Sequence, residues 1–154
     1  DLAIGPEQSL FVSDLPGNTI YKIEPLNKWR VTAHARGRQL KQPNGLIYDV
    51  RFNRLVIASW ETGQLLALNQ DGSVIVLFKN SSLKSLDGIA FDTKKNIILS
   101  SFNQGKVYRL KKYSTLEVLR KNINGPAGLS VDHKNNLLLI TSYKGNLVFT
   151  LPLN

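Results

Sequence analysis

Two oxygen-bearing side chains occupy equivalent positions in a repeated motif and could bind a metal ion together. Asn44 precedes the glycine of Gly45-Leu-Ile-Tyr-Asp49, and Asp87 precedes the glycine of Gly88-Ile-Ala-Phe-Asp92. Amide and carboxylate oxygens suit a hard cation such as Ca²⁺, which takes about six to eight oxygen ligands. The alternative is purely conformational, because Asn and Asp before glycine are favoured in turns, where they bond their own backbone. The chemistry therefore depends on whether the fold brings the two residues together.

The same motif occurs a third time, and its period predicts a β-propeller. Gly128-Leu-Ser-Val-Asp132 follows the copies that begin at Gly45 and Gly88, so the spacings are 43 and 40 residues. Each copy continues with a second apolar run, a turn containing glycine and a third run. Short runs rich in Leu and β-branched residues, bounded by Gly, Asn, Asp or Pro, predict β-strands. A period near 40 residues built from such strands is typical of a propeller blade.

We therefore predict an all-β fold, a β-propeller of four-stranded antiparallel blades that occupies residues 1–154 as one domain. The blades would span about residues 1–42, 43–85, 86–125 and 126–154. Because the fourth predicted blade stops after its third strand, we expect a partial ring that belongs to a longer polypeptide. A closed four-bladed ring and a ring completed by oligomerisation are the alternatives.

Composition limits the partners and sites that can be expected. Twenty Lys and Arg residues against eleven Asp and Glu residues give a formal net charge of +9, which favours an anionic partner such as a nucleic acid, a glycan or a membrane surface. A basic surface without a partner is the alternative, since the basic residues are scattered. The absence of cysteine excludes disulfides and thiolate metal sites. No apolar run is long enough to span a bilayer. The localisation stays unknown, because a signal peptide could have been removed before Asp1.

Propeller topology sorts the polar residues onto two faces. Loops that enter the first strand of each blade lie on the same face as turns between second and third strands, so Asn44, Asp87 and Ala127 are expected together at the mouth of the central channel. Turns between first and second strands, and between third and fourth strands, lie on the opposite face. We predict that this face is basic and forms a possible anion-binding face, made of Arg51, Arg54, Lys94, Lys95, Lys111, Lys112 and Lys134.

Other repeated positions are better explained by packing than by chemistry. Large apolar residues follow the second strand of successive blades, and we expect them to pack between blades: Trp60, Phe102 and Tyr143. A small hydroxyl residue ends the second run where the first copy has Asp14, which is typical of a buried hydrogen-bonding position: Ser59, Ser101 and Ser142. His34 and His133 fall in different blades, and we predict that both are solvent-exposed and form no catalytic pair.

The chain resembles the six-bladed propellers of the gluconolactonase/regucalcin type, which are related more widely to NHL-repeat, paraoxonase and strictosidine-synthase-like propellers. The resemblance is carried by Pro43-Asn-Gly-Leu46, by Leu86-Asp-Gly-Ile-Ala-Phe-Asp92 and by Asn103-Gln-Gly-Lys-Val-Tyr-Arg-Leu110. In gluconolactonase-like proteins an Asn and an Asp at such positions bind the catalytic divalent metal, and the next blade supplies no ligand. Asn44, Asp87 and Ala127 follow that order. The family's other ligands, a glutamate and a second asparagine, have no assignable counterpart here.

The resemblance implies a metal-dependent lactonase or esterase-like hydrolase that acts on a small lactone or ester. Asn44 and Asp87 would bind Ca²⁺ or another divalent metal at the channel mouth, and Asp87 would be catalytic by orienting the attacking water. The alternative is a non-enzymatic NHL-type scaffold that binds a protein or an anionic partner through the basic face. The sequence leaves open whether the protein is an enzyme.

Overall fold

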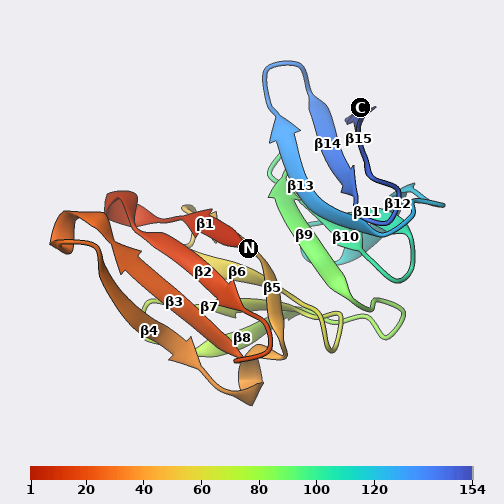
Figure 1. The fold of residues 1–154 in the computed structure, drawn as a ribbon. Coiled ribbons are helices and arrows are strands. Elements are labelled where there is room, and N and C mark those ends of the chain that lie inside the picture. Colours follow the sequence, from red (N-terminus) through yellow and green to blue (C-terminus); the bar gives the residue numbers. More distant parts are fainter. Residues whose placement is uncertain (154) are drawn as a thin grey trace.

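The computed structural model of the protein describes residues 1–153 and contains four antiparallel sheets in chain order (Figure 1). Within each sheet the strands lie in sequence order, so every sheet is a simple meander. The first sheet contains β1 (Leu2–Ile4), β2 (Leu10–Asp14), β3 (Thr19–Glu24) and β4 (Arg30–Arg36), and the second contains β5 (Pro43–Asp49), β6 (Arg54–Ser59), β7 (Leu65–Leu68) and β8 (Val74–Phe78). The third contains β9 (Leu86–Phe91), β10 (Ile97–Ser101), β11 (Lys106–Lys111) and β12 (Thr115–Arg120), and the fourth contains β13 (Pro126–Asp132), β14 (Leu137–Ser142) and β15 (Leu147–Pro152).

This arrangement confirms the prediction of an all-β propeller built from antiparallel blades, the last of which has three strands. Three short 3₁₀ turns occur among residues 1–153, all within or directly after the first blade: η1 (Pro6–Gln8), η2 (Pro25–Asn27) and η3 (Arg38–Leu40). Within this range no helix has the length and apolar character that a membrane crossing requires.

The hydrophobic core lies between successive blades. In β6, Ile57 faces the first blade and belongs to the same buried cluster as Phe11. Its neighbour Val56 faces the third blade and belongs to a second buried cluster, which includes Leu99. Side chains alternate between the two faces of a strand, so a strand covered on both faces is apolar throughout. The continuous apolar character of the second strand in each repeat therefore reflects burial between two neighbouring blades.

The outer faces of the first and last blades are open in the described residues. In the first blade, Leu2, Ile4 and Val31 have 51%, 69% and 60% of their surfaces exposed. In the last blade, Val148 is 68% exposed. Residues 1–153 thus form a stack of four blades whose two end faces are not covered, as expected for a partial ring.

Candidate functional site

The glycine that opens a blade allows the innermost strands of neighbouring blades to approach closely. A β-carbon on Gly45 would lie 2.1 Å from the carbonyl oxygen of Asp87, and one on Gly88 would lie 2.4 Å from the carbonyl oxygen of Ala127. Neither distance is possible for a real side chain, so glycine is required by packing at both positions. This contact between β5 and β9 places the residue before Gly45 beside the start of the next blade.

Asn44 and Asp87 are brought together at this point, as the repeat predicted. The Asn44 Nδ2 lies 3.5 Å from the carbonyl oxygen of Leu86, the residue before Asp87, and the Asn44 side chain is near enough to favour the ionised form of the Asp87 carboxyl. Both side chains are half-buried. Burial raises the pKa of the Asp87 carboxyl, while the chain's amino group and the Asn44 side chain act in the opposite direction.

Residues that the sequence analysis did not single out also surround this position. The Ser13 hydroxyl donates to the carbonyl oxygen of Asn44 at 2.7 Å. The Asp1 carboxylate accepts hydrogen bonds from the backbone of Leu46 and Leu2, both at 2.8 Å. Asp1 is therefore adjacent to the site, but both of its carboxylate oxygens are occupied by backbone donors.

Ser13 belongs to a repeated position whose role becomes clear only in three dimensions. In the third blade Ser100 takes the same place, where its hydroxyl donates to the carbonyl oxygen of Ala127 at 2.6 Å and accepts from the amide of Gly88 at 2.7 Å. The hydroxyl thus connects the second strand of one blade to the residue that opens the next blade. The second blade has Ala58 at this place. A hydroxyl at one offset in three of the four repeats, Ser13, Ser100 and Thr141, was the signal available in the sequence.

The donor chemistry of Asn44 and Asp87 fits a hard divalent cation, but it supplies only part of a coordination shell. Asn44 and Asp87 together offer three side-chain oxygens, and rotation of the Asn44 amide would be needed to turn its oxygen toward an ion, whereas Ca²⁺ takes about six to eight oxygen ligands. Among residues 1–153, no group of three or more His, Cys, Asp or Glu side chains could hold a metal ion. Ala127, the third residue at the channel mouth, has no donor side chain. Within residues 1–153, water, substrate oxygens or main-chain carbonyl groups would have to add to these ligands.

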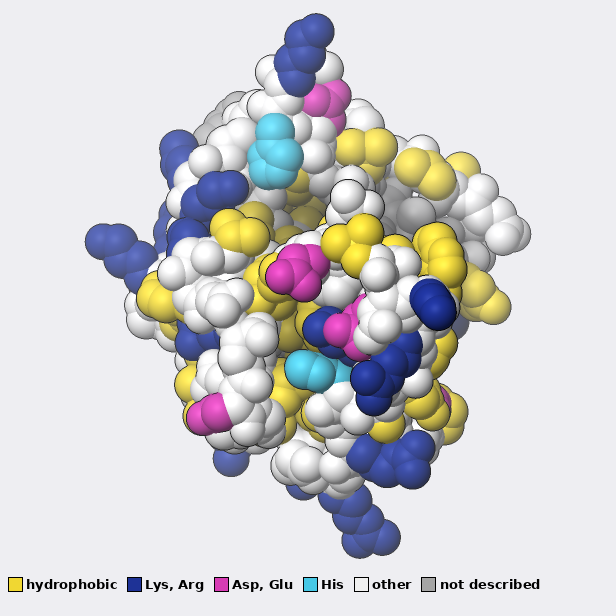
Figure 2. Space-filling view, turned by 90° about the vertical axis from the view of Figure 1, so that its left-hand side faces the viewer, with side chains coloured by type: hydrophobic (Ala, Val, Ile, Leu, Met, Phe, Trp, Pro, Cys, Tyr) yellow, Lys and Arg dark blue, Asp and Glu magenta, His cyan; other side chains and the backbone are white. Residues whose placement is uncertain are grey.

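The predicted basic face is only partly available to an anion. Arg51 forms a bidentate ion pair with the buried Asp49, with nitrogen–oxygen distances of 2.8 and 2.9 Å. Lys111 forms an ion pair with Glu117 at 2.8 Å. Elsewhere on the molecule, Figure 2 shows Lys and Arg side chains in separate groups around the edge of one face, without a continuous basic surface.

The other members of the basic face divide into two groups. Arg54 lies over the Phe52 ring at 4.5 Å and donates to the Tyr113 hydroxyl at 3.3 Å, so it is part of a packed cluster. Four of the predicted residues line a cavity of about 170 Å³: Arg51, Lys94, Lys95 and Lys112. Lys111 and Lys134 are not in this lining.

The residues predicted to pack between blades do so. Trp60 contacts Phe102 with ring centroids 5.6 Å apart, and Phe102 contacts Tyr143 at 5.9 Å. The hydroxyl groups at the ends of the second strands are buried and donate to main-chain carbonyl groups, as expected: Ser59 to Lys41, Ser101 to Lys84 and Ser142 to Asn124. In the first blade, the Asp14 carboxylate accepts from the amide of Gly17 at 2.9 Å, which is a turn role.

The prediction for His34 was wrong. Its ring packs edge-on against Phe11 with centroids 5.1 Å apart, and it is half-buried. Burial lowers the pKa of His34. His34 lies within β4, whose alternation turns this side chain toward Phe11, and the sequence analysis did not assign the faces of this strand. His133 is exposed, as predicted.

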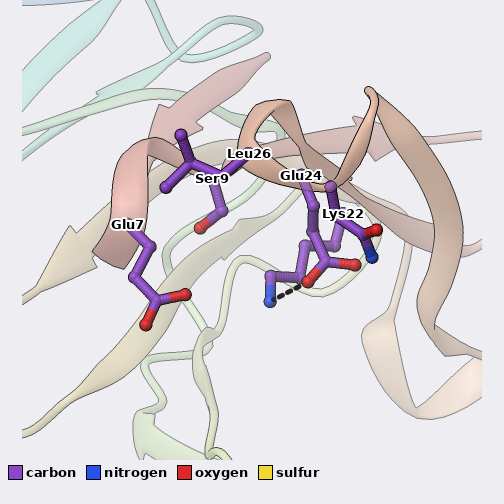
Figure 3. Close-up of a pocket in the computed structure, with 6 residues that line it drawn as sticks. Glu7, Ser9, Lys22, Glu24 and Leu26 are labelled. Atoms are coloured by element: carbon purple, nitrogen blue, oxygen red, sulfur yellow. Dashed lines mark hydrogen bonds and ion pairs between the residues drawn. The ribbon is translucent and has the colours of Figure 1, made fainter.

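A further hollow of about 290 Å³ lies between the two 3₁₀ turns of the first blade and was not predicted (Figure 3). Lys22 and Glu24, both on β3, form an ion pair on one side of it at 3.2 Å, and Glu7 and Ser9 also contribute to its wall. The only cation in its lining is thus already paired, so the hollow presents no free positive charge, and the exposed Glu7 carboxylate is the charge in its lining that forms no ion pair among residues 1–153.

Comparison with known proteins supports the fold. No protein-family profile matches the chain, and no curated protein sequence is significantly similar to it. Among solved structures, a gluconolactonase from Xanthomonas campestris is 18% identical with a TM-score of 0.85, covering 99% of this chain and 57% of that one. A virginiamycin B lyase from Staphylococcus aureus is 16% identical with a TM-score of 0.77, covering 99% and 51%.

A chain in the crystal structure of a nidogen/laminin complex is 17% identical with a TM-score of 0.80, covering 99% of this chain and 58% of that one. The chain therefore spans between about half and three fifths of the length of these proteins. At such identities the likeness establishes the fold alone. The protein is accordingly a four-bladed β-propeller segment of the fold shared by gluconolactonase, virginiamycin B lyase and the nidogen/laminin structure, in agreement with the resemblance seen in the sequence.

Proposed function

We propose that the protein is a metal-dependent hydrolase of lactones or esters whose reaction centre is the channel mouth at Asn44 and Asp87. The observation that carries this proposal is the juxtaposition of the two residues across the boundary of the second and third blades, where Asn44 Nδ2 lies 3.5 Å from the carbonyl oxygen of Leu86, the residue before Asp87. Two residues whose side chains carry oxygen donors, from successive blades, lie together where the innermost strands approach closely. The fold is similar to that of a gluconolactonase, and this similarity supports the choice of lactones as the substrate class.

Each residue has a distinct task in this proposal. Asn44 and Asp87 would hold Ca²⁺ or a similar ion, which when bound polarises a substrate carbonyl and lowers the pKa of water. The Asp87 carboxylate would orient the attacking water and accept its proton. Ser13 would fix the backbone of Asn44 through the 2.7 Å hydrogen bond, so that the amide oxygen keeps its direction.

A non-enzymatic scaffold is the second candidate. It is supported by the likeness to a propeller that forms part of a protein complex, the nidogen/laminin structure. In that case the channel-mouth residues would serve only to join the blades, and the juxtaposition of Asn44 and Asp87 would remain without a metal.

Lactone hydrolysis measured with and without added Ca²⁺ separates the two candidates. We expect Ca²⁺-dependent hydrolysis of a δ-lactone by the wild-type protein, and its loss in Asp87→Ala and Asn44→Ala. Asp71→Asn is the matched control, because Asp71 is an exposed carboxylate in the turn after β7 and contacts only Ser73. Full activity in Asp87→Ala would refute the proposal, and an inactive wild-type protein that binds no divalent ion would favour the scaffold.

A further inference from the structure

The cavity of about 170 Å³ on the face opposite Asn44 gathers unpaired positive charge at the junction of the second and third blades. Arg51, Lys94, Lys95 and Lys112 contribute to its lining together with Asn96 and Tyr113. Among residues 1–153, the three lysines form no ion pair. The cavity is smaller than the roughly 300–1,000 Å³ of sites for drug-sized ligands, so its natural occupant is a single small group.

Two buried carboxylates lie close to these cations, and both are already engaged. Asp49 is 1% exposed and accepts two hydrogen bonds from Arg51. Asp92 is 2% exposed, lies 3.1 Å from the Arg109 guanidinium and accepts hydrogen bonds from the amides of Lys94 and Asn96. The carboxylates therefore hold the backbone and the arginines in place, and they leave the three lysine charges uncompensated.

Arg51 is held in a fixed orientation at the cavity. Its Nε and Nη2 atoms donate to Asp49, and its guanidinium lies 5.1 Å from the centre of the Phe91 ring. The Tyr113 hydroxyl donates to the same Asp49 carboxylate at 3.2 Å. An arginine anchored along one edge in this way keeps its Nη1 donor for a ligand, and arginine donors suit the oxygens of phosphate and related anions.

The backbone adds an independent observation. Lys95 has φ of 62° in the turn between the first two strands of its blade, one residue before Asn96, which is the counterpart of Asn53 and Asn136 in the second and fourth blades. Asparagine tolerates this left-handed conformation better than lysine does. Lys112, which also lines the cavity, has φ of 49°, and the same conformation occurs outside the cavity at Lys28 and Lys41. The backbone therefore identifies Lys95 as a position where asparagine fits well, while the charge and geometry of the lining identify the site.

We propose that this cavity binds a tetrahedral oxyanion group, a phosphate or sulfate monoester carried by a small molecule. Arg51 would donate from its fixed guanidinium, and the flexible side chains of Lys94, Lys95 and Lys112 would close around the remaining oxygens. The site is separate from Asn44 and Asp87 and does not depend on the function proposed for them.

The test uses inorganic phosphate, sulfate and glucose 6-phosphate, each titrated into the protein at low ionic strength and followed by amide chemical shifts. We expect saturable binding, with the largest shifts at the amides of Lys95, Asn96 and Lys112. Tighter binding of glucose 6-phosphate than of the free anions would identify a monoester as the ligand, and equal binding would identify the free oxyanion.

Lys95→Asn is the decisive variant because it removes one charge from the cavity lining and places asparagine at φ of 62°, a conformation that asparagine tolerates, so it should preserve or raise stability. We expect it to weaken binding by about tenfold, in line with loss of one charged hydrogen bond. Lys28→Asn is the matched control, since Lys28 has φ of 52° in a turn of the first blade and is outside the cavity lining. Equal weakening of binding in both variants would overturn the proposal in favour of non-specific attraction. The same conclusion would follow if an RNA oligonucleotide bound more tightly than the small anions and Lys28→Asn also weakened that binding. Absence of saturable binding would overturn it as well.

Discussion

The carbonyl oxygen of Asp87 lies against the α-carbon of Gly45, so close that a β-carbon at this position would come within 2.1 Å of it. One contact therefore has two consequences. It lets the innermost strands of the second and third blades pack together, and it brings the Asn44 side chain beside Asp87. The packing of the blades and the geometry of the candidate site depend on the same glycine.

Substitution of the blade-opening glycines tests this relationship. We expect Gly45→Ala and Gly88→Ala to lower the free energy of unfolding by about 1–3 kcal/mol or more, as overpacking does, because each β-carbon would meet a carbonyl oxygen at 2.1 or 2.4 Å. Gly128→Ala is the internal control, since its β-carbon would have only the Thr141 hydroxyl nearby, at 3.6 Å. Urea denaturation of the three variants measures the difference. Similar costs at all three positions would show that strand conformation, and not the neighbouring blade, requires glycine.

The ionisation of Asp87 predicts a dependence of stability on pH. Because burial raises the pKa of this carboxyl, the folded state holds the proton more tightly than the unfolded state does. The ionised form therefore destabilises the fold at pH values above the raised pKa, and this cost disappears as the pH falls through it. Asp87→Asn should raise the melting temperature at pH 7, and the difference from wild type should shrink toward pH 3. A stabilisation that is constant with pH would contradict this assignment.

The ion pair between Asp92 and Arg109 is expected to matter far more for stability than those on the surface. Asp92 is 2% and Arg109 is 7% exposed, and their charged atoms are 3.1 Å apart. Arg109→Met would leave the buried carboxylate without its counter-charge, at a cost of about 3 kcal/mol or more. Lys111→Met, which breaks the exposed pair with Glu117, should cost less than about 1 kcal/mol. Comparable losses in chemical denaturation would mean that the buried pair contributes no more than a surface contact.

The fold could be predicted from the sequence because its causes are local and repeated. Apolar runs such as Arg54–Ser59 are continuous since both of their faces are covered, and the recurring glycine marks the contact between neighbouring blades. The meeting of Asn44 and Asp87 followed from the same repeat, because equivalent positions in successive blades lie side by side.

The electrostatic details could not be predicted in the same way. Nothing in the spacing of Asp49 and Arg51 shows that the turn folds back to pair them, and the contact between Tyr113 and Asp49 joins residues 64 positions apart. The packing of His34 against Phe11 likewise depends on the register of β4 within the first blade. Such contacts are set by tertiary structure. Because Arg51 and Lys111 are paired with carboxylates, the predicted basic face carries less free positive charge than its number of Lys and Arg residues suggested.

Divalent-ion binding at Asn44 and Asp87 is the central claim, and a titration with Mn²⁺ followed by paramagnetic broadening of amide signals tests it most directly. Because only two side-chain ligands are present, we expect weak binding, with a dissociation constant of about 10⁻⁴–10⁻³ M. The account predicts that the amides of Asn44, Gly45, Asp87 and Gly88 broaden first, that excess Ca²⁺ restores them, and that Asp87→Asn abolishes the effect while Asp71→Asn preserves it. Broadening that is absent from these four amides, or that persists unchanged in Asp87→Asn, would contradict it.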